Sequence, residues 1–287
     1  MDFFALAPGT PDDELKAAVE RRISRVVDQA DSIAGYNLVI LYDDIIIARS
    51  DANRIYRALA AVDKDRPILL VLKSPGGDIP AAYFIGKLCR EHTTDRFEVA
   101  IPREAKSAAT LTCCGADVIH MGSLSELGPI DPLFNGMPAL AVKHSLEHLA
   151  EIASLHPGSG AMISDYLSKS LSVNVIGHVE RAAESAAQYA ERLLANRSSP
   201  MDATASAEIA RRLVYDYKDH GFVIDAREAA DIFGEAMVKA DTPHYHVADQ
   251  IYEELDLMAF VAGRRFNRDL AFTGGVSGGC IVRARDD

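Results

Sequence analysis

The stretch LLVLKSPGGD, residues 69–78, decides the fold, because it joins an apolar strand to a glycine turn. Its apolar part belongs to the run 67–72, which is typical of a strand covered on both faces. The turn at Gly76 and Gly77 then leads into a helical pattern over 79–90. Ligands of open α/β sheets gather at this edge, and paired glycines let a backbone N–H approach them closely. SPGG is also a common structural turn, so this stretch does not identify a site by itself.

Ser107 follows the next strand along the chain. A strand is predicted over 97–101 and a turn over 103–106, after which Ser107 opens a helix of small residues over 107–114. A hydroxyl at a helix N-terminus is exposed, and the helix dipole stabilises an anion that develops there. The alternative interpretation is that Ser107 serves only as a helix N-cap.

The remaining pattern alternates strands with helices, which predicts an α/β fold with a mostly parallel sheet. Further strands are expected at 38–42 and 117–121, and further helices at 11–34 and 51–62. Residues 138–213 are mainly helical, with a loop at 156–160 and an amphipathic helix over 174–196. The glycine- and arginine-rich end, 263–287, is expected to be a flexible tail. We therefore divide the chain into a helical segment 1–35, a main domain 36–262 and this tail.

The net charge, the cysteines and the distribution of apolar residues indicate which partners and which cellular compartment to expect. The formal net charge of −12 over 287 residues argues against a nucleic-acid partner, which would require clustered Lys and Arg. The four cysteines show no metal-ligand spacing and are interpreted as reduced core thiols. No signal peptide is evident at the N-terminus, and no apolar run approaches the ~20 residues of a membrane span. The expectation is a soluble, cytoplasmic protein without a membrane partner.

Taken together, the motifs resemble the Clp/crotonase superfamily, and most closely its serine dehydrogenase proteinase family. This family is similar to the Clp proteases and the signal peptide peptidases. The resemblance covers roughly residues 38–234 and implies repeated ββα-type units around a mostly parallel sheet, with a helical C-terminal part. The stretches that carry it are LKSPGGD (72–78), AKSAATL (105–111), GADVI (115–119), SELGPIDP (125–132) and, more weakly, HGFVIDAREA (220–229).

The resemblance implies a serine peptidase that acts on peptides or proteins through an acyl-enzyme on Ser107, without a cofactor or metal. It implies an oxyanion hole made by the backbone N–H groups of Gly77 and Ala108. Gly76 and Pro129, which lie in the same motifs, are expected to contact the substrate. Relatives of this fold usually form oligomers, so a homo-oligomer is expected, and an ATPase or adaptor partner is compatible with the family.

The general base is the open question. Clp proteases carry a histidine immediately before a proline in the segment that corresponds to 128–132, and this sequence has none there. His220 lies near the position of the Clp aspartate, and Asp131 lies near the position of the Clp histidine. Together with Ser107 they would form a triad in which the histidine and the aspartate have exchanged positions, which is admissible because triads are defined by geometry. A Ser–Lys dyad with Lys169 or Lys143 is a second option, and Lys169 follows apolar residues that predict partial burial. The third option is that no base exists.

Two alternatives to a peptidase remain. A family member without activity would serve as a scaffold or subunit of a larger assembly. A crotonase-like enzyme acting on an acyl-CoA thioester would keep the fold but would require glutamate acid/base groups. A His-x-His pair, His244 and His246, is weak evidence for a metal because no third ligand lies nearby in the sequence.

Overall fold

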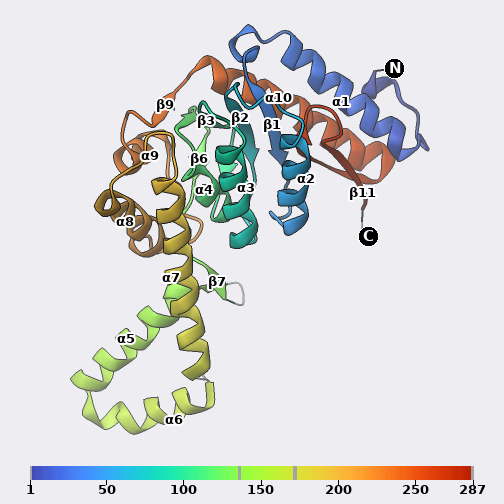
Figure 1. Cartoon of the computed structure of the whole chain (residues 1–287). Coiled ribbons are helices and arrows are strands. Elements are labelled where there is room, and N and C mark those ends of the chain that lie inside the picture. Colours follow the sequence, from blue (N-terminus) through green and yellow to red (C-terminus); the bar gives the residue numbers. More distant parts are fainter. Residues whose placement is uncertain (1, 135–136, 171–172, 286–287) are drawn as a thin grey trace.

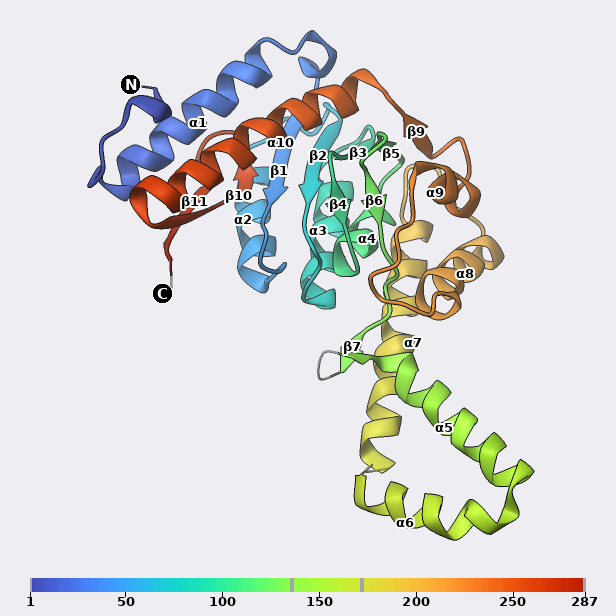
Figure 2. The same ribbon diagram turned by 180° about the vertical axis from the view of Figure 1, so that it is seen from behind.

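The computed structural model describes residues 2–134, 137–170 and 173–285 of the chain. Its centre is a seven-stranded sheet of order β11-β10-β1-β2-β3-β5-β9 (Figures 1 and 2). Strands β1, β2, β3, β5 and β9 run parallel to one another, while β10 and β11 join antiparallel at one side. The bounds are β1 (Asn37–Tyr42), β2 (Ile68–Lys73), β3 (Phe97–Ile101), β5 (Val118–Met121), β9 (Val238–Ala240), β10 (Arg268–Gly275) and β11 (Cys280–Ala284).

Helices cover both faces of this sheet, which explains why its central strands are apolar at almost every position. Helices α1 (Asp12–Asp28) and α10 (Pro243–Val261) pack side by side on one face. Helices α2 (Arg49–Leu59), α3 (Ile79–Glu91), α4 (Ala108–Cys113) and part of α7 (Val173–Ala195) cover the other. Successive residues of one strand therefore enter different cores: Leu70 and Leu72 face α2 and α3, whereas Leu69 and Val71 face α1 and α10.

A helical arm projects from this body (Figure 2). It begins at the short strands β7 (Leu133–Phe134) and β8 (Met137–Pro138) and is built from α5 (Ala139–Leu155), a 3₁₀ turn (Pro157–Ser159), α6 (Gly160–Ser170) and the start of α7. Helices α8 (Ala203–Arg211) and α9 (Ala226–Phe233) return the chain to the β9 side of the sheet. None of the helices in the described ranges is both long enough and apolar enough to cross a membrane.

The predicted α/β class and mostly parallel sheet are confirmed, and the differences are local. Helix α1 ends at Asp28 instead of Ala34, because a separate 3₁₀ turn, Asp31–Ile33, follows it. Pro11 precedes the helix as its N-cap. Helix α2 begins at Arg49 instead of Asp51, with Ala48 as its N-cap, and the Asp51 carboxylate accepts a hydrogen bond from the Ala48 N–H.

The expectation of a flexible tail over 263–287 is wrong. Strand β10 pairs with β1 and β11 pairs with β10, so the described part of this segment completes the sheet. Phe272 of β10 is fully buried in the core between the sheet and helices α1 and α10, which we call the α1/α10 core. The glycines that suggested mobility belong to a tight hairpin: Gly274 and Gly278 have φ of +138° and +78°, and a Cβ on Gly279 would lie 2.3 Å from the Phe272 ring.

Candidate active site

The glycine turn after β2 is held against a neighbouring backbone at Ile47. The Ile47 N–H donates to the Gly76 carbonyl at 2.6 Å, and the Asp78 N–H donates to the Ile47 carbonyl at 2.8 Å. A Cβ on Gly77 would lie only 2.3 Å from the Ile47 carbonyl oxygen, so no other residue fits there. Gly77 itself is exposed, and its N–H has no acceptor among the described residues. The turn therefore presents a bare amide at the carboxyl end of a parallel strand.

Ser107 lies at a strained turn between strand and helix. Its φ of 50° and ψ of −116° are unusual for a residue with a side chain, and such a conformation costs on the order of 1–3 kcal/mol. Bonds on both sides maintain it: the Lys106 N–H donates to the Ser74 carbonyl, and the Ala109 N–H donates to the Lys106 carbonyl. The Ser107 hydroxyl caps no N–H of α4, so the interpretation of Ser107 as a simple N-cap is wrong. A sharp turn of this kind presents a nucleophilic hydroxyl away from the backbone.

The two turns touch each other. A Cβ added to Gly76 would lie 2.9 Å from the Ser107 Cβ and 3.3 Å from the Ala108 nitrogen. Gly76 has φ of +115°, so its backbone conformation and the lack of space both require glycine. The Ala108 N–H, like that of Gly77, has no acceptor in the described part of the chain. The structure thus brings Ser107 and Ala108 against the turn that contains Gly77, the other predicted oxyanion donor.

His220 and Asp131 are also brought together. His220 Nδ1 lies 2.8 Å from Asp131 Oδ1, and Asp131 is buried while the His220 side chain is 20% exposed. Their segments pair through two backbone hydrogen bonds between Leu127 and Ile224, of 2.9 and 3.1 Å. When Nδ1–H donates to the carboxylate, Nε2 carries the lone pair that a general base needs. The hydrogen bonds of the described residues do not include one between Ser107 and His220.

Lys106 connects these two parts of the site, a role that sequence reasoning missed. Its Nζ pairs with Glu126 at 2.9 Å and donates to the carbonyls of Gly221 and Phe222 at 3.4 and 3.2 Å. The residue beside the nucleophile therefore holds the segment that follows His220. The Lys106 side chain also packs closely on Gly128, where an added Cβ would lie 2.7 Å from it.

The other predicted residues lie differently. The partial burial expected for Lys169 is wrong: its side chain is 72% exposed on α6 and pairs with Asp165 at 2.7 Å. Lys143 falls in α5, and its side chain is outside the described residues. Pro129 is buried, so the expected contact with substrate would require its backbone or a change in packing. The roles of all these residues stay predictions.

Known proteins resemble the chain over different lengths. Two uncharacterized proteins of Methanocaldococcus jannaschii are 37% identical over 101 residues and 33% identical over 96 residues. These matches cover 35% and 33% of this chain and 35% and 32% of the relatives, so about a third of each relative is spanned.

Two solved structures of mutants of the membrane-bound stomatin-specific protease 1510-N, one in complex with a substrate peptide, are 14% identical to the chain. They align over 77% and 88% of this chain and 86% and 89% of theirs, with TM-scores of 0.43 and 0.44. The family model of the ClpP-like SDH-type serine proteinases matches residues 13–154, which include the glycine turn and Ser107. Over these residues the chain belongs to the family of ClpP-like SDH-type serine proteinases.

Proposed function

We propose that this chain is a serine peptidase that hydrolyses peptide bonds through an acyl-enzyme on Ser107. The Ser107 hydroxyl attacks the peptide carbonyl and gives its proton to Nε2 of His220. Asp131 holds the imidazole in the required tautomer and stabilises the imidazolium. The developing oxyanion accepts hydrogen bonds from the N–H groups of Gly77 and Ala108. His220 returns the proton to the leaving amine, and water then hydrolyses the ester by the reverse sequence.

The close approach of Gly76 to Ser107 is the observation that carries this proposal. It sets a strained serine beside two amides that have no acceptor among the described residues. Preorganised donors of this kind supply much of the stabilisation of a tetrahedral intermediate. Loss of one such donor lowers kcat by about 10²–10³-fold. The Ser107–His220 hydrogen bond would form as substrate binds, since catalytic hydrogen bonds often tighten only in the complex.

Apolar side chains border the proposed site and support a substrate class. Ile46, which is 56% exposed, precedes the residue that holds the glycine turn. Phe222 and Val223 are 43% and 54% exposed and belong to the segment held by Lys106. We expect endopeptidase cleavage of segments with apolar residues near the scissile bond, because such residues would bury these three side chains.

A homo-oligomer is part of the proposal. Leu155, Met162 and Tyr166 on the arm are 69%, 70% and 64% exposed, and a second copy of the chain would cover them. The four cysteines are free and buried, which supports a reducing, cytoplasmic compartment. An ATPase or adaptor partner remains a prediction from the family alone.

Hydrolysis of fluorogenic peptides and of an unfolded protein substrate tests the function. The wild-type chain should cleave apolar peptides, and Ser107→Ala should reduce kcat to the level of the uncatalysed control. Ser159→Ala is the matched control, because Ser159 is partly exposed on the arm and, among the described residues, bonds only to the His156 carbonyl there. A folded wild-type chain without activity on any peptide would favour the scaffold alternative, and turnover of an acyl-CoA would favour the crotonase alternative.

A further inference from the structure

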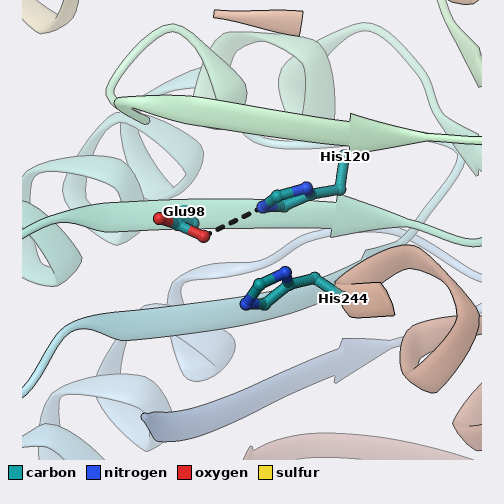
Figure 3. Close-up of side chains that lie close together, drawn as sticks. All are labelled: Glu98, His120 and His244. Carbon is teal, nitrogen blue, oxygen red and sulfur yellow. Dashed lines mark hydrogen bonds and ion pairs between the residues drawn. The ribbon is translucent and has the colours of Figure 1, made fainter. Parts of the chain in front are cut away.

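A second polar cluster lies on the face of the sheet opposite Ser107. Glu98 comes from β3, His120 from β5 and His244 from the first turn of α10, and the three side chains converge (Figure 3). Glu98 points to the same side of β3 as Ala100, which belongs to the α1/α10 core. Helix α4, which follows Ser107, packs in the other core. The cluster is therefore separate from the peptidase site.

The ligand-type atoms of the three residues lie within 4.8 Å of one another. His120 Nε2 is 2.9 Å from Glu98 Oε2, and the His120 and His244 rings are stacked with their centroids 4.7 Å apart. His244 Nε2 is buried and has no hydrogen-bond partner among the described residues. An imidazole nitrogen left in this state costs stability, and a bound cation would satisfy it.

Neighbouring residues orient the cluster in the way that outer partners orient metal ligands. The Thr242 hydroxyl lies 2.8 Å from His120 Nδ1, and the Tyr36 hydroxyl donates to Glu98 Oε2 at 3.2 Å. Because a hydroxyl can donate or accept, Thr242 accommodates either tautomer of His120. The tautomer with the proton on Nδ1 leaves Nε2 free to bind a metal.

We propose that Glu98, His120 and His244 bind one divalent transition-metal ion of the zinc type. Two imidazoles and one carboxylate suit Zn²⁺, whereas Ca²⁺ and Mg²⁺ prefer sites made of oxygen ligands. Tetrahedral coordination with bonds of about 2.0–2.1 Å would require the partly exposed His244 to move toward the other two ligands, and the Glu98 and His120 ligand atoms, now 2.9 Å apart, to separate slightly. The fourth position is left for water.

The surroundings of Glu98 and His244 also bear on the proposed metal site. Nη1 of Arg96 forms an ion pair with Glu98 Oε1 at 3.2 Å. The other carboxylate oxygen, Oε2, is therefore the one that faces the imidazoles. Burial, together with the nearby His120, lowers the pKa of His244. His246, the second member of the His-x-His pair, is exposed on α10 and lies outside the cluster. The two ligands that accompany His244 come from β3 and β5, more than a hundred residues earlier along the chain.

The metal would fasten α10 to β3 and β5, across the face of the sheet that α1 also covers. Binding to the folded chain alone would then stabilise it by mass action, independently of any peptidase activity.

Titration of the full-length, tag-free chain with Co²⁺ and then Zn²⁺ tests this inference. After treatment with a chelator, the wild type should bind one Co²⁺ per chain with the visible absorption of a tetrahedral site, and Zn²⁺ should displace it. His244→Ala should weaken Zn²⁺ binding by at least about 100-fold, since a direct ligand is lost. His244 is partly exposed and its Nε2 makes no hydrogen bond in the described structure, so this variant is expected to fold, as circular dichroism would verify.

His246→Ala and His148→Ala are the matched controls, because both side chains are exposed and lie outside the cluster. Both should bind Zn²⁺ as the wild type does. Wild-type affinity in His244→Ala, loss of binding in either control, or no binding by the folded wild type would overturn the proposal.

Discussion

His220 Nδ1 lies 2.8 Å from Asp131 Oδ1, although 89 residues of sequence separate the two. Asp131 is buried and His220 is partly exposed, so the carboxylate fixes one imidazole nitrogen while the other can meet a hydroxyl. The segments that carry them are joined by paired backbone bonds at Leu127 and Ile224. His220 thus reaches the segment 128–132, which contains no histidine of its own, from another part of the chain.

Asp131→Asn should lower kcat for peptide hydrolysis by about 10²–10⁴-fold, because the imidazole loses both its tautomer and the charge that stabilises it. The KM should change little, since Asp131 is buried and does not contact the substrate in the proposed mechanism. Steady-state kinetics on a fluorogenic peptide, together with a thermal melt to confirm folding, measure this. An unchanged kcat in the folded variant would exclude His220–Asp131 as the base pair.

Gly76→Ala should lower the free energy of unfolding by about 1–3 kcal/mol and abolish turnover. The new Cβ would collide with the Lys106 carbonyl and the Ser107 Cβ at a φ of +115°. Gly158→Ala is the control, since nothing lies within 4 Å of a Cβ there, and its unfolding free energy should stay within about 1 kcal/mol of wild type. Denaturant unfolding measures both variants, and equal stability of the two would contradict the close contact of the turns.

Lys106→Met should lower the free energy of unfolding by about 1–3 kcal/mol and slow hydrolysis, because the Glu126 pair and two carbonyl bonds are lost. Lys169→Met should leave both unchanged within about 0.5 kcal/mol, since Lys169 makes an exposed ion pair. Denaturant unfolding and peptide hydrolysis, measured in parallel for the two variants, check these expectations. Loss of activity in a stable Lys169→Met variant would instead support the Ser–Lys dyad.

The four cysteines should resist alkylation in the folded chain. Burial raises the pKa of Cys89, Cys114 and Cys280 to about 12, so at pH 8 these thiols stay protonated and unreactive. Burial also raises the pKa of Cys113. Intact mass after iodoacetamide treatment should show no adduct on the native chain and four on the unfolded one. Rapid modification of the native protein would show that these thiols are accessible.

The sheet and the serine turn could be predicted because their signals are local. Strand β2 is apolar at nearly every position, a glycine turn follows it directly, and a run of small residues begins at Ser107 after β3. The C-terminal strands were missed because glycine was interpreted as mobility, whereas Gly279 is needed for a backbone that packs directly on Phe272. Partial burial of Lys169 was predicted from Met162 and Tyr166, but these residues are themselves exposed on the arm.

Relationships between distant residues were harder to predict. The sequence offered His220 and Asp131 as one option among three, and only the tertiary structure brings them into contact. The contact of Lys106 with the backbone at Gly221 was missed, because it joins residues that are far apart in the sequence. Glu98 lies in an apolar strand and His120 in another, so neither suggested a ligand until α10 placed His244 against them.

Labelling with a fluorophosphonate, followed by mass spectrometry to locate the adduct, tests the central claim that His220 activates Ser107. The wild-type chain should carry one adduct, on Ser107, while Ser107→Ala should carry none. His220→Ala should react at least about 100-fold more slowly, and Lys169→Ala should react as the wild type does. An adduct on another residue, or no adduct on a folded wild-type chain, would contradict the account.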